Sequence, residues 1–533
     1  MQSLWRLTLF LCCLWAATLL YGEMVAYWVP LSTCKWPRLT PSSSSSSPSS
    51  SVKVAVVADP QKFSLQLMDS TSLGLAPDSF ALEVAQFYTD LYMRRAFHTS
   101  ILPFKPDVVL FLGDYFDGGP YMSDDEWQES LSRFKHIFGV NEKRRDSDTP
   151  YYYLCGNHDI GYAAFHSQHP EVISRYENEF GSRNYHFSIG KVNFIVVDGQ
   201  TLDGPKQGNQ TSLSWNFIKN ISNDIKSNPT VLLTHIPLYR PDNTHCGPYR
   251  SSPVINQRIS YAAFDQGITY QNYLDKETSN LLLSSIKPIL VLSGHDHDQC
   301  TVFHSTPFGS VLEHTLGTIS WQQGNLYPSF MLMSVASRLL PNATEPENSV
   351  STLLCFLPKQ THIYIWYICQ FVLTLLLLII WPTTGFGSWS YLDRFLDVIK
   401  AIGNNFGNTA KEKDDEENCD YEMIWDAEGS MHLVKKATSK APNINSEAIK
   451  TGRGNVVARP TARKHMMEPG PSDYIEINTE ARSDDAGKVP RFTKSKATRL
   501  VQRLIRVIRL LVVIAAVNVP LYMMLLFKDW IER

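Results

Sequence analysis

Three long apolar runs constrain what this chain of 533 residues can fold into more than any other feature of its sequence. They cover Leu7–Gly22, Ile363–Trp381 and Leu510–Phe527. A helix of about 20 apolar residues crosses a bilayer, and these runs are too uniformly apolar for amphipathic helices. Buried core helices remain the alternative for the last two runs, and a cleaved signal peptide for the first. We expect a signal anchor or transmembrane helix within residues 1–30 and transmembrane helices at 363–381 and 507–527.

Composition excludes several broad classes of protein. The formal net charge of −3 argues against a basic nucleic-acid binder and against an acidic disordered protein. Hydrophobic residues make up 44% of the chain, which is far above the level of a disordered protein. The nine cysteines are too few for a scaffold built from disulfides, and no C-x-x-C pair suggests a zinc site.

Charge and glycosylation signals predict the side of the membrane on which each segment lies. Residues 385–506 read as largely disordered, and the stretch 488–509 at their end is basic without any acidic residue. Basic residues beside a span mark the cytoplasmic side, so we expect 385–506 in the cytosol. The region before the second span then lies in the lumen. It holds the sequence's three N-x-S/T sequons, at Asn209, Asn220 and Asn342.

The region of residues 52–340, which follows a Ser-rich linker at 31–51, alternates strand and helix patterns. Strands are expected at 52–57, 107–112, 151–155, 185–189, 192–197, 230–233 and 288–292. Helices are expected at about 79–98, from the capping box Ser123–Glu126 to Phe138, at 170–180 and at 212–225. Such alternation predicts an α/β domain, with a sheet covered by helices.

Polar side chains follow five of these strands at the point where each strand ends. They occur in the segments Asp59-Pro-Gln61, Gly113-Asp114-Tyr-Phe-Asp117, Gly156-Asn157-His158-Asp159, Thr234-His235 and Gly294-His295-Asp-His297. The carboxyl ends of strands face the ligand crevice in open α/β sheets, so we expect these side chains to converge. Carboxylate, amide and imidazole ligands suit divalent metals, and two such ions can clamp a phosphate for in-line attack.

This order of motifs resembles the calcineurin-like metallophosphoesterases over about residues 52–335. The resemblance implies a four-layer sandwich of two mixed β-sheets flanked by helices. It also implies two divalent metals, manganese as the first choice and iron or zinc as alternatives. Asp59, Asp114 and His297 would bind one ion; Asp114, Asn157, His235 and His295 would bind the other. His158 would contact the scissile phosphate as the catalytic group. Asp117 and Asp159 would fix imidazole tautomers from behind.

Gln61 departs from the family pattern, which has His at this position. An amide oxygen is neutral and harder than an imidazole nitrogen, so Gln61 as a ligand would weaken the first metal site or shift it from zinc toward manganese. A degraded site without catalysis is the alternative interpretation.

Further motifs narrow the resemblance to the membrane-anchored branch that acts on glycosylphosphatidylinositol (GPI) anchors. They are Leu238-Tyr239-Arg240, Cys246-Gly247, Ser293 to Cys300, Ser320-Trp321 and Pro328-Ser-Phe330. This branch implies a phosphodiesterase of the endoplasmic reticulum or Golgi that removes ethanolamine phosphate from a mannose, aiding maturation and transport of GPI-anchored proteins. Cys246 and Cys300 would form a disulfide beside the luminal site. The alternatives are a phosphoesterase for nucleotides, phosphoproteins or other lipids, and a catalytically weak trafficking factor.

Overall fold

The computed structural model describes most of the chain outside the long polar segment. The described residues are 2–39, 51–61, 80–140, 149–166, 169–204, 209–224, 228–252, 257–261, 267–321, 325–337, 346–381, 421–425, 431–435 and 496–531. The chain divides into two units, one of residues 1–388 with 505–533 and the other of residues 389–504.

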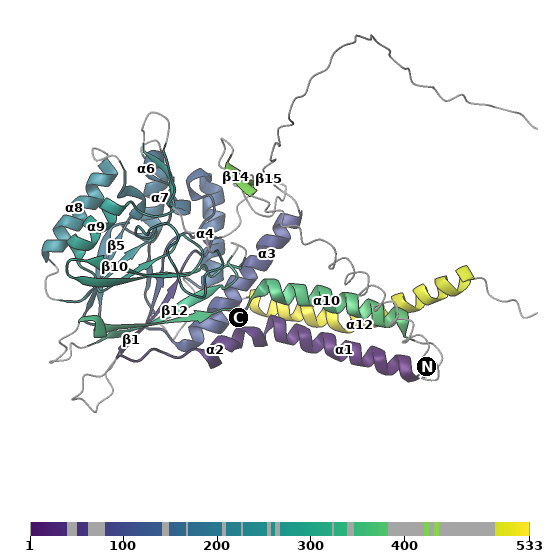
Figure 1. Cartoon of the computed structure of the whole chain (residues 1–533). Helices are drawn as coiled ribbons and strands as arrows, with labels where there is room; N and C mark the ends of the chain where they lie inside the picture. Colours follow the sequence, from purple (N-terminus) through teal and green to yellow (C-terminus); the bar gives the residue numbers. More distant parts are fainter. Residues whose placement is uncertain are drawn as a thin grey trace, which may run out of the picture. The chain divides into compact units, whose positions relative to one another are not determined.

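Two mixed sheets form the centre of the first unit (Figure 1). The first has the strand order β13-β12-β1-β2-β3 and the second the order β10-β11-β9-β6-β5-β4. The strands of the first sheet are β1 (Ser51–Val57), β2 (Val108–Phe111), β3 (Tyr151–Tyr153), β12 (Ser329–Ala336) and β13 (Val350–Phe356). Those of the second are β4 (Tyr185–Ile189), β5 (Val192–Val197), β6 (Thr230–Thr234), β9 (Leu290–Ser293), β10 (Cys300–Thr306) and β11 (Gly309–Thr315).

Three apolar cores hold four layers together. The core between the sheets combines β-branched and long side chains from both, such as Val56 and Met331 with Val231 and Leu292. Helices α3 (Phe80–Arg95), α4 (Asp124–Phe138) and α7 (Pro170–Phe180) cover the outer face of the first sheet. Helices α8 (Asn209–Asp224) and α9 (Lys276–Ile286) cover the second. The expected four-layer sandwich is thereby confirmed.

The capping box at the start of α4 forms as expected, with the Ser123 hydroxyl accepting from the Glu126 N–H and the Glu126 carboxylate accepting from the Ser123 N–H. The sequence did not reveal α9, the hairpin β7 (Ile259–Tyr261) and β8 (Ile268–Gln271), or the strands after β9. Among these, β12 is central, because β1 pairs with it antiparallel along its length. Its sequence SFMLMSVA is buried throughout and therefore lacks the alternation that marks a half-buried strand.

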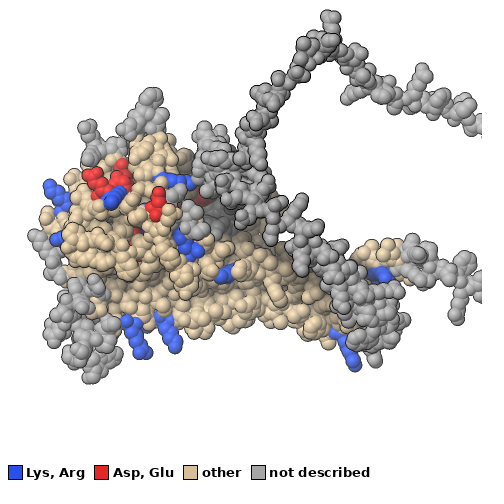
Figure 2. All heavy atoms as spheres, viewed as in Figure 1, with Lys and Arg blue, Asp and Glu red and all other residues tan. Residues whose placement is uncertain are grey.

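Among the described residues, three helices are long and apolar enough to cross a membrane, and they lie side by side in Figure 1; we name them the spans. They are α1 (Gln2–Glu23), α10 (Gln360–Ile380) and α12 (Lys496–Trp530). Trp15 of α1 donates to Thr374 of α10, and Thr18 donates to Gln370. The third helix is longer than the apolar run and continues through Pro520. Figure 2 shows few charged side chains along the spans on the face that it presents.

A buried cluster of charges joins the spans to the sandwich; we name Glu23, Arg95, Tyr367 and Asp529 the junction cluster. The Arg95 guanidinium, at the end of α3, pairs with Glu23 of α1 and with Asp529 of α12. It also donates to the Leu525 carbonyl oxygen at 2.7 Å. Tyr367 of α10 donates to the other Glu23 oxygen at 2.9 Å. The Arg95 cation therefore contacts α1 and α12 directly, and Glu23 and Tyr367 connect it to α10.

Within the segment 385–506, expected to be largely disordered, the described residues form a hairpin and the first turns of α12. The hairpin pairs β14 (Tyr421–Trp425) with β15 (Met431–Lys435). The remainder of the segment, most of the Ser-rich linker and the sequon Asn342 lie outside the described residues.

Candidate metal centre

The five strand-end segments meet at one end of the sandwich. β1 and β2 are parallel neighbours in the first sheet, as are β6 and β9 in the second. Four side chains leave these ends from left-handed backbone, with φ of 47° at Asp59, 60° at Asp114, 69° at His295 and 55° at His297. Such conformations cost about 1–3 kcal/mol each in a residue with a Cβ, and they cluster at functional sites.

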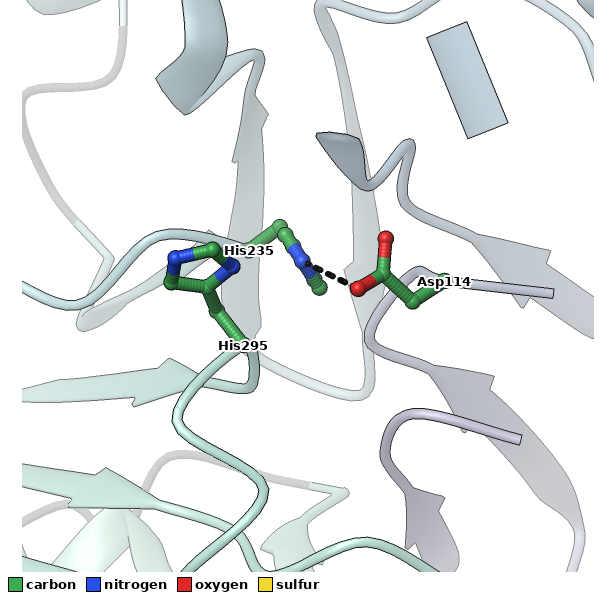
Figure 3. A group of neighbouring side chains, drawn as sticks. All are labelled: Asp114, His235 and His295. Carbon is green, nitrogen blue, oxygen red and sulfur yellow. Dashed lines mark ion pairs between the residues drawn. The ribbon is translucent and has the colours of Figure 1, made fainter. Parts of the chain in front are cut away.

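Backbone carbonyls set the orientation of two imidazoles toward Asp114. His235 Nδ1 lies 2.7 Å from the Leu112 carbonyl oxygen, and its Nε2 lies 3.2 Å from Asp114 Oδ2. His295 Nε2 lies 2.9 Å from the Gln271 carbonyl oxygen, which leaves Nδ1 as its second nitrogen. Figure 3 shows both rings beside the Asp114 carboxylate, with the His235 pair dashed. The nitrogens that do not face carbonyls are the ones available to a metal.

Two groups of side chains have ligand atoms close enough to hold an ion, and they share Asp114. One is Asp114, His235 and His295; the other is Asp59, Asp114 and His297. Within each group the ligand atoms lie within 4.8 Å of one another. These groups are contained in the two ligand sets that the sequence predicts, and Asp114 is the residue that both groups share.

The two amide side chains of the predicted set lie beside the same ligands. Asn157 Oδ1 is 3.2 Å from His235 Nε2, and the Gln61 amide nitrogen donates to Asp114 Oδ2 at 2.6 Å. Both side chains are buried. Rotation of the Gln61 amide about its last bond exchanges its nitrogen and oxygen, so the oxygen can face a cation beside Asp114.

The electrostatics of the cluster call for bound cations. Burial raises the pKa of Asp59 to about 8, with Asp114 adding to the rise. Burial also lowers the pKa of His295 to about 3 and that of His297 to about 4. Asp59 Oδ2 and His295 Nδ1 are buried and have no hydrogen-bond partner among the described atoms. Buried lone pairs without a hydrogen-bond partner destabilise the folded protein, and divalent ions would supply the missing partners.

His158 lies at the open side of the cluster. Its backbone N–H donates to Asp114 Oδ1 at 2.9 Å, and its Nδ1 lies 2.7 Å from the Asp117 carbonyl oxygen. The Asp117 carboxylate is 3.6 Å from the same nitrogen. Burial opposes protonation of His158, but the charges of Asp114 and Asp117 outweigh it and raise its pKa. Asp117 therefore orients the His158 ring at Nδ1, through its backbone carbonyl as well as its carboxylate.

Asp159 holds the backbone rather than an imidazole. Its carboxylate accepts from the N–H groups of Gly156, Asp114, Tyr115 and Phe116, at 2.7 to 3.3 Å. Its hydrogen bonds within the described residues run to these backbone groups and not to a histidine ring, contrary to our expectation. Gly156 is required beside it, because a Cβ there would lie 2.0 Å from Asp114 Oδ1. Asp159 thus ties the loop after β2 to the loop after β3, and so places Asp114.

Contacts around the last loop were not apparent from the sequence. Asp296, between the two histidines, pairs with Arg250 at 2.7 Å and accepts from the Tyr273 hydroxyl. Cys246 and Cys300, the pair expected from the sequence, form a disulfide beside this loop, whereas the second disulfide, between Cys34 and Cys355, was not expected. Cys155 is a buried free thiol. Arg250, Tyr273 and the pair Cys34–Cys355 lie far from the motifs along the chain, so spacing alone gives no signal for their contacts.

The metal centre lies at the end of the first sheet from which α10 leaves. β12 is antiparallel to both β1 and β13, so β1 and β13 run in the same direction. Met331 of β12 is level with Val56 of β1 and with Leu354 of β13. β1 then leads to Asp59, and β13 leads to the start of α10 at Gln360.

A short segment connects the centre with the span directly. Thr318 donates from its hydroxyl to the Asp59 carbonyl oxygen and from its N–H to that of His297. Three residues later, the Trp321 ring packs edge-on against Tyr364 of α10, with centroids 5.6 Å apart.

Comparison with known proteins agrees with this geometry. The profile of the calcineurin-like phosphoesterases matches residues 52–299. This chain therefore contains a calcineurin-like metallophosphoesterase domain, and this domain makes it a phosphoric ester hydrolase. Domains of this family use a dinuclear metal centre.

Two groups of relatives define the branch more narrowly. Metallophosphoesterase 1 of Mus musculus is 29% identical over 342 residues, which are 60% of this chain and 78% of the mouse protein. Cell division control protein 1 of Saccharomyces cerevisiae is 28% identical over 381 residues, which are 68% of this chain and 72% of the yeast protein. Among solved structures, a purple acid phosphatase from yellow lupin covers 57% of this chain and 54% of its own, at 13% identity and a TM-score of 0.32.

Proposed function

We propose that this protein is a phosphodiesterase that removes ethanolamine phosphate from a mannose of GPI anchors. The observation that carries the proposal is the position of the metal centre at the sheet end that leads into α10. A phosphodiester on a lipid-linked glycan lies close to the bilayer surface, where a centre placed in this way would meet it. The relatives named Metallophosphoesterase 1 support a phosphoester substrate.

Luminal placement of the domain forms part of this proposal. Two disulfides join residues of the domain and of the segment before it, and disulfides persist in the secretory pathway but not in the cytosol. The sequon residues Asn209 and Asn220 are both exposed on α8. The basic stretch 488–509, which includes the first turns of α12, favours the opposite side for residues 385–506. We place the protein in the endoplasmic reticulum or Golgi.

The chain's own residues define the roles in the reaction. Asp59, Gln61, Asp114, Asn157, His235, His295 and His297 would hold two divalent ions, for which we propose manganese. Two such ions supply a nucleophile from water and neutralise charge on the phosphate. Asp117 holds His158 by Nδ1, so Nε2 is directed away from this contact and toward the leaving oxygen of the substrate. Asp159 keeps the backbone of two ligand loops fixed during the reaction.

The full chain in lipid nanodiscs, loaded with manganese, tests the proposal. We expect release of ethanolamine phosphate from a GPI glycan that carries it, and loss of release in Asp114→Asn. Asp124→Asn is the matched control, because Asp124 is exposed on α4 away from the centre. Cleavage of an aryl phosphodiester alone would replace the GPI substrate with another. No turnover of either substrate, with both metals bound, would favour the trafficking factor.

A further inference from the structure

A second site lies outside the metal centre, where the first two spans meet the sandwich. A cavity of about 1030 Å³ is enclosed by α1, by α2 (Val29–Thr33), by the end of β13 and by the first turns of α10. Its walls include Ala17, Ala26, Phe356 and Trp366. The volume is at the upper end of the range typical of sites for small molecules, about 300–1,000 Å³. We name this cavity the span groove.

The span groove is built by close helix packing. Gly22 of α1 lies against Tyr367 of α10, and a Cβ at this glycine would be 2.1 Å from the tyrosine hydroxyl. Two polar groups within the groove already have partners: Tyr367 donates to Glu23, and Thr18 donates to Gln370. Most of the other side chains between α1 and α10 are apolar, so this part of the groove favours a hydrocarbon ligand over a polar one.

The mouth of the groove lies at the level of the bilayer surface. Tyr21, Trp28 and Trp366 are large and between 46% and 60% exposed, and aromatic residues of this kind concentrate at membrane–water interfaces. Lys359 and His362 line the groove just before the apolar part of α10. The groove thus has an apolar body beside the hydrocarbon and polar groups at the headgroup level.

The charged groups at the mouth of the groove are basic and not acidic. Lys359 and His362 line the groove, whereas no Asp or Glu does so among the described lining residues. The Lys359 ammonium lies 3.9 Å from the centroid of the Tyr327 ring, which holds it at the groove without neutralising it. A cationic mouth over an apolar body is complementary to a ligand with an anionic head and acyl chains.

We propose that the span groove binds an anionic glycerophospholipid of the bilayer. Its acyl chains would lie between α1 and α10, and its phosphate would contact Lys359 and His362. Lipids of the bilayer would surround these spans, so such a lipid would be present at the mouth of the groove at high concentration. This inference does not depend on the substrate proposed above, because the groove shares no residue with the metal centre.

Photocrosslinking of the full chain in nanodiscs tests the proposal. The probes are phosphatidylinositol and phosphatidylcholine with the same photoactivatable acyl chain, and labelled residues are identified by mass spectrometry. We expect labelling of α1 and α10 within the groove, stronger with phosphatidylinositol. Ala17→Trp, which fills the groove from an exposed position on α1, should lower this labelling at least about tenfold. Lys359→Gln should remove the preference between the two headgroups.

The matched control is Leu20→Trp, which adds the same ring to an exposed position of α1 that does not line the groove. Its labelling should equal that of the wild type. Equal labelling by both probes, undiminished in Ala17→Trp, would show general contact of the spans with lipid and would overturn the proposal. A GPI glycolipid is itself an anionic glycerophospholipid. Displacement of the probe by it, at concentrations far below those of phosphatidylinositol, would therefore identify the lipid of the substrate as the occupant and would overturn an occupant that is independent of the proposed substrate.

Discussion

The metal centre and the junction cluster are two groups of charged side chains that differ in the source of the cation that pairs with their carboxylates. In the junction cluster the Arg95 guanidinium reaches two carboxylates and a carbonyl oxygen, so its cation is part of the chain. In the metal centre two carboxylates lie among imidazoles, and Asp59 Oδ2 and His295 Nδ1 lack hydrogen-bond partners among the described atoms. The comparison teaches that unsatisfied lone pairs, rather than buried charge itself, distinguish a ligand site from a structural ion pair.

The largest expected effect follows from removing the carboxylate shared by both ligand groups. Asp114→Asn keeps the shape but removes the charge that would bridge two ions. We expect a loss of phosphodiesterase activity of at least about 10³-fold, since metal ions contribute several kcal/mol to such reactions. Metal content should fall as well, whereas the junction cluster should be unaffected. Retained activity with two metals per chain would contradict the role of Asp114.

Arg95→Met provides the opposite test, because it removes the internal cation and leaves Glu23 buried. We expect destabilisation of about 3–5 kcal/mol, as is usual when one partner of a buried ion pair is removed. Thermal unfolding of the full chain in detergent measures it. The double variant Arg95→Met with Glu23→Gln should recover part of this loss. Metal content of the folded fraction should equal that of the wild type; its loss would mean that the two clusters are coupled.

Asp159→Asn tests positioning within the metal centre. The amide replaces one acceptor oxygen with a donor that faces the N–H groups of Gly156, Asp114, Tyr115 or Phe116. Groups that support metal ligands commonly change affinity or activity by about 10–100-fold. We expect a fall of that size in kcat and in manganese affinity, measured by titration. Unchanged affinity would assign Asp159 to folding alone.

These two clusters also show how much the sequence alone predicts. The strand-end motifs predicted that these side chains converge, because each motif follows a strand directly and the sheet brings the strand ends together. The four-layer sandwich and the two ligand groups were implied by the resemblance that the motifs carry. Arg95, Glu23 and Asp529 stand in three segments without any motif, so their pairing depends on packing that spacing does not encode. The contacts of the Leu112 and Gln271 carbonyl oxygens with the histidines could not be predicted either, because every residue has a backbone carbonyl. Asp159 was assigned to the correct region, but its partners are backbone groups.

Gln61→His should produce the smallest effect, because it alters one ligand without removing charge. An imidazole favours zinc over manganese more than an amide oxygen does. We expect the ratio of zinc to manganese affinity to rise by about tenfold, a difference of about 1.4 kcal/mol. Competition between the two metals, followed by elemental analysis, measures the ratio. An unchanged ratio would show that Gln61 contacts Asp114 but binds no metal.

Metal stoichiometry tests the central claim most directly. The full chain would be purified, freed of metal and titrated with manganese, and then studied by electron paramagnetic resonance with Arg95→Met and Asp114→Asn in parallel. We predict two manganese ions per chain with magnetic coupling in the wild type and in Arg95→Met. Asp114→Asn should lack the coupled pair. Uncoupled ions in the wild type, or a coupled pair in Asp114→Asn, would contradict a centre in which Asp114 bridges two metals.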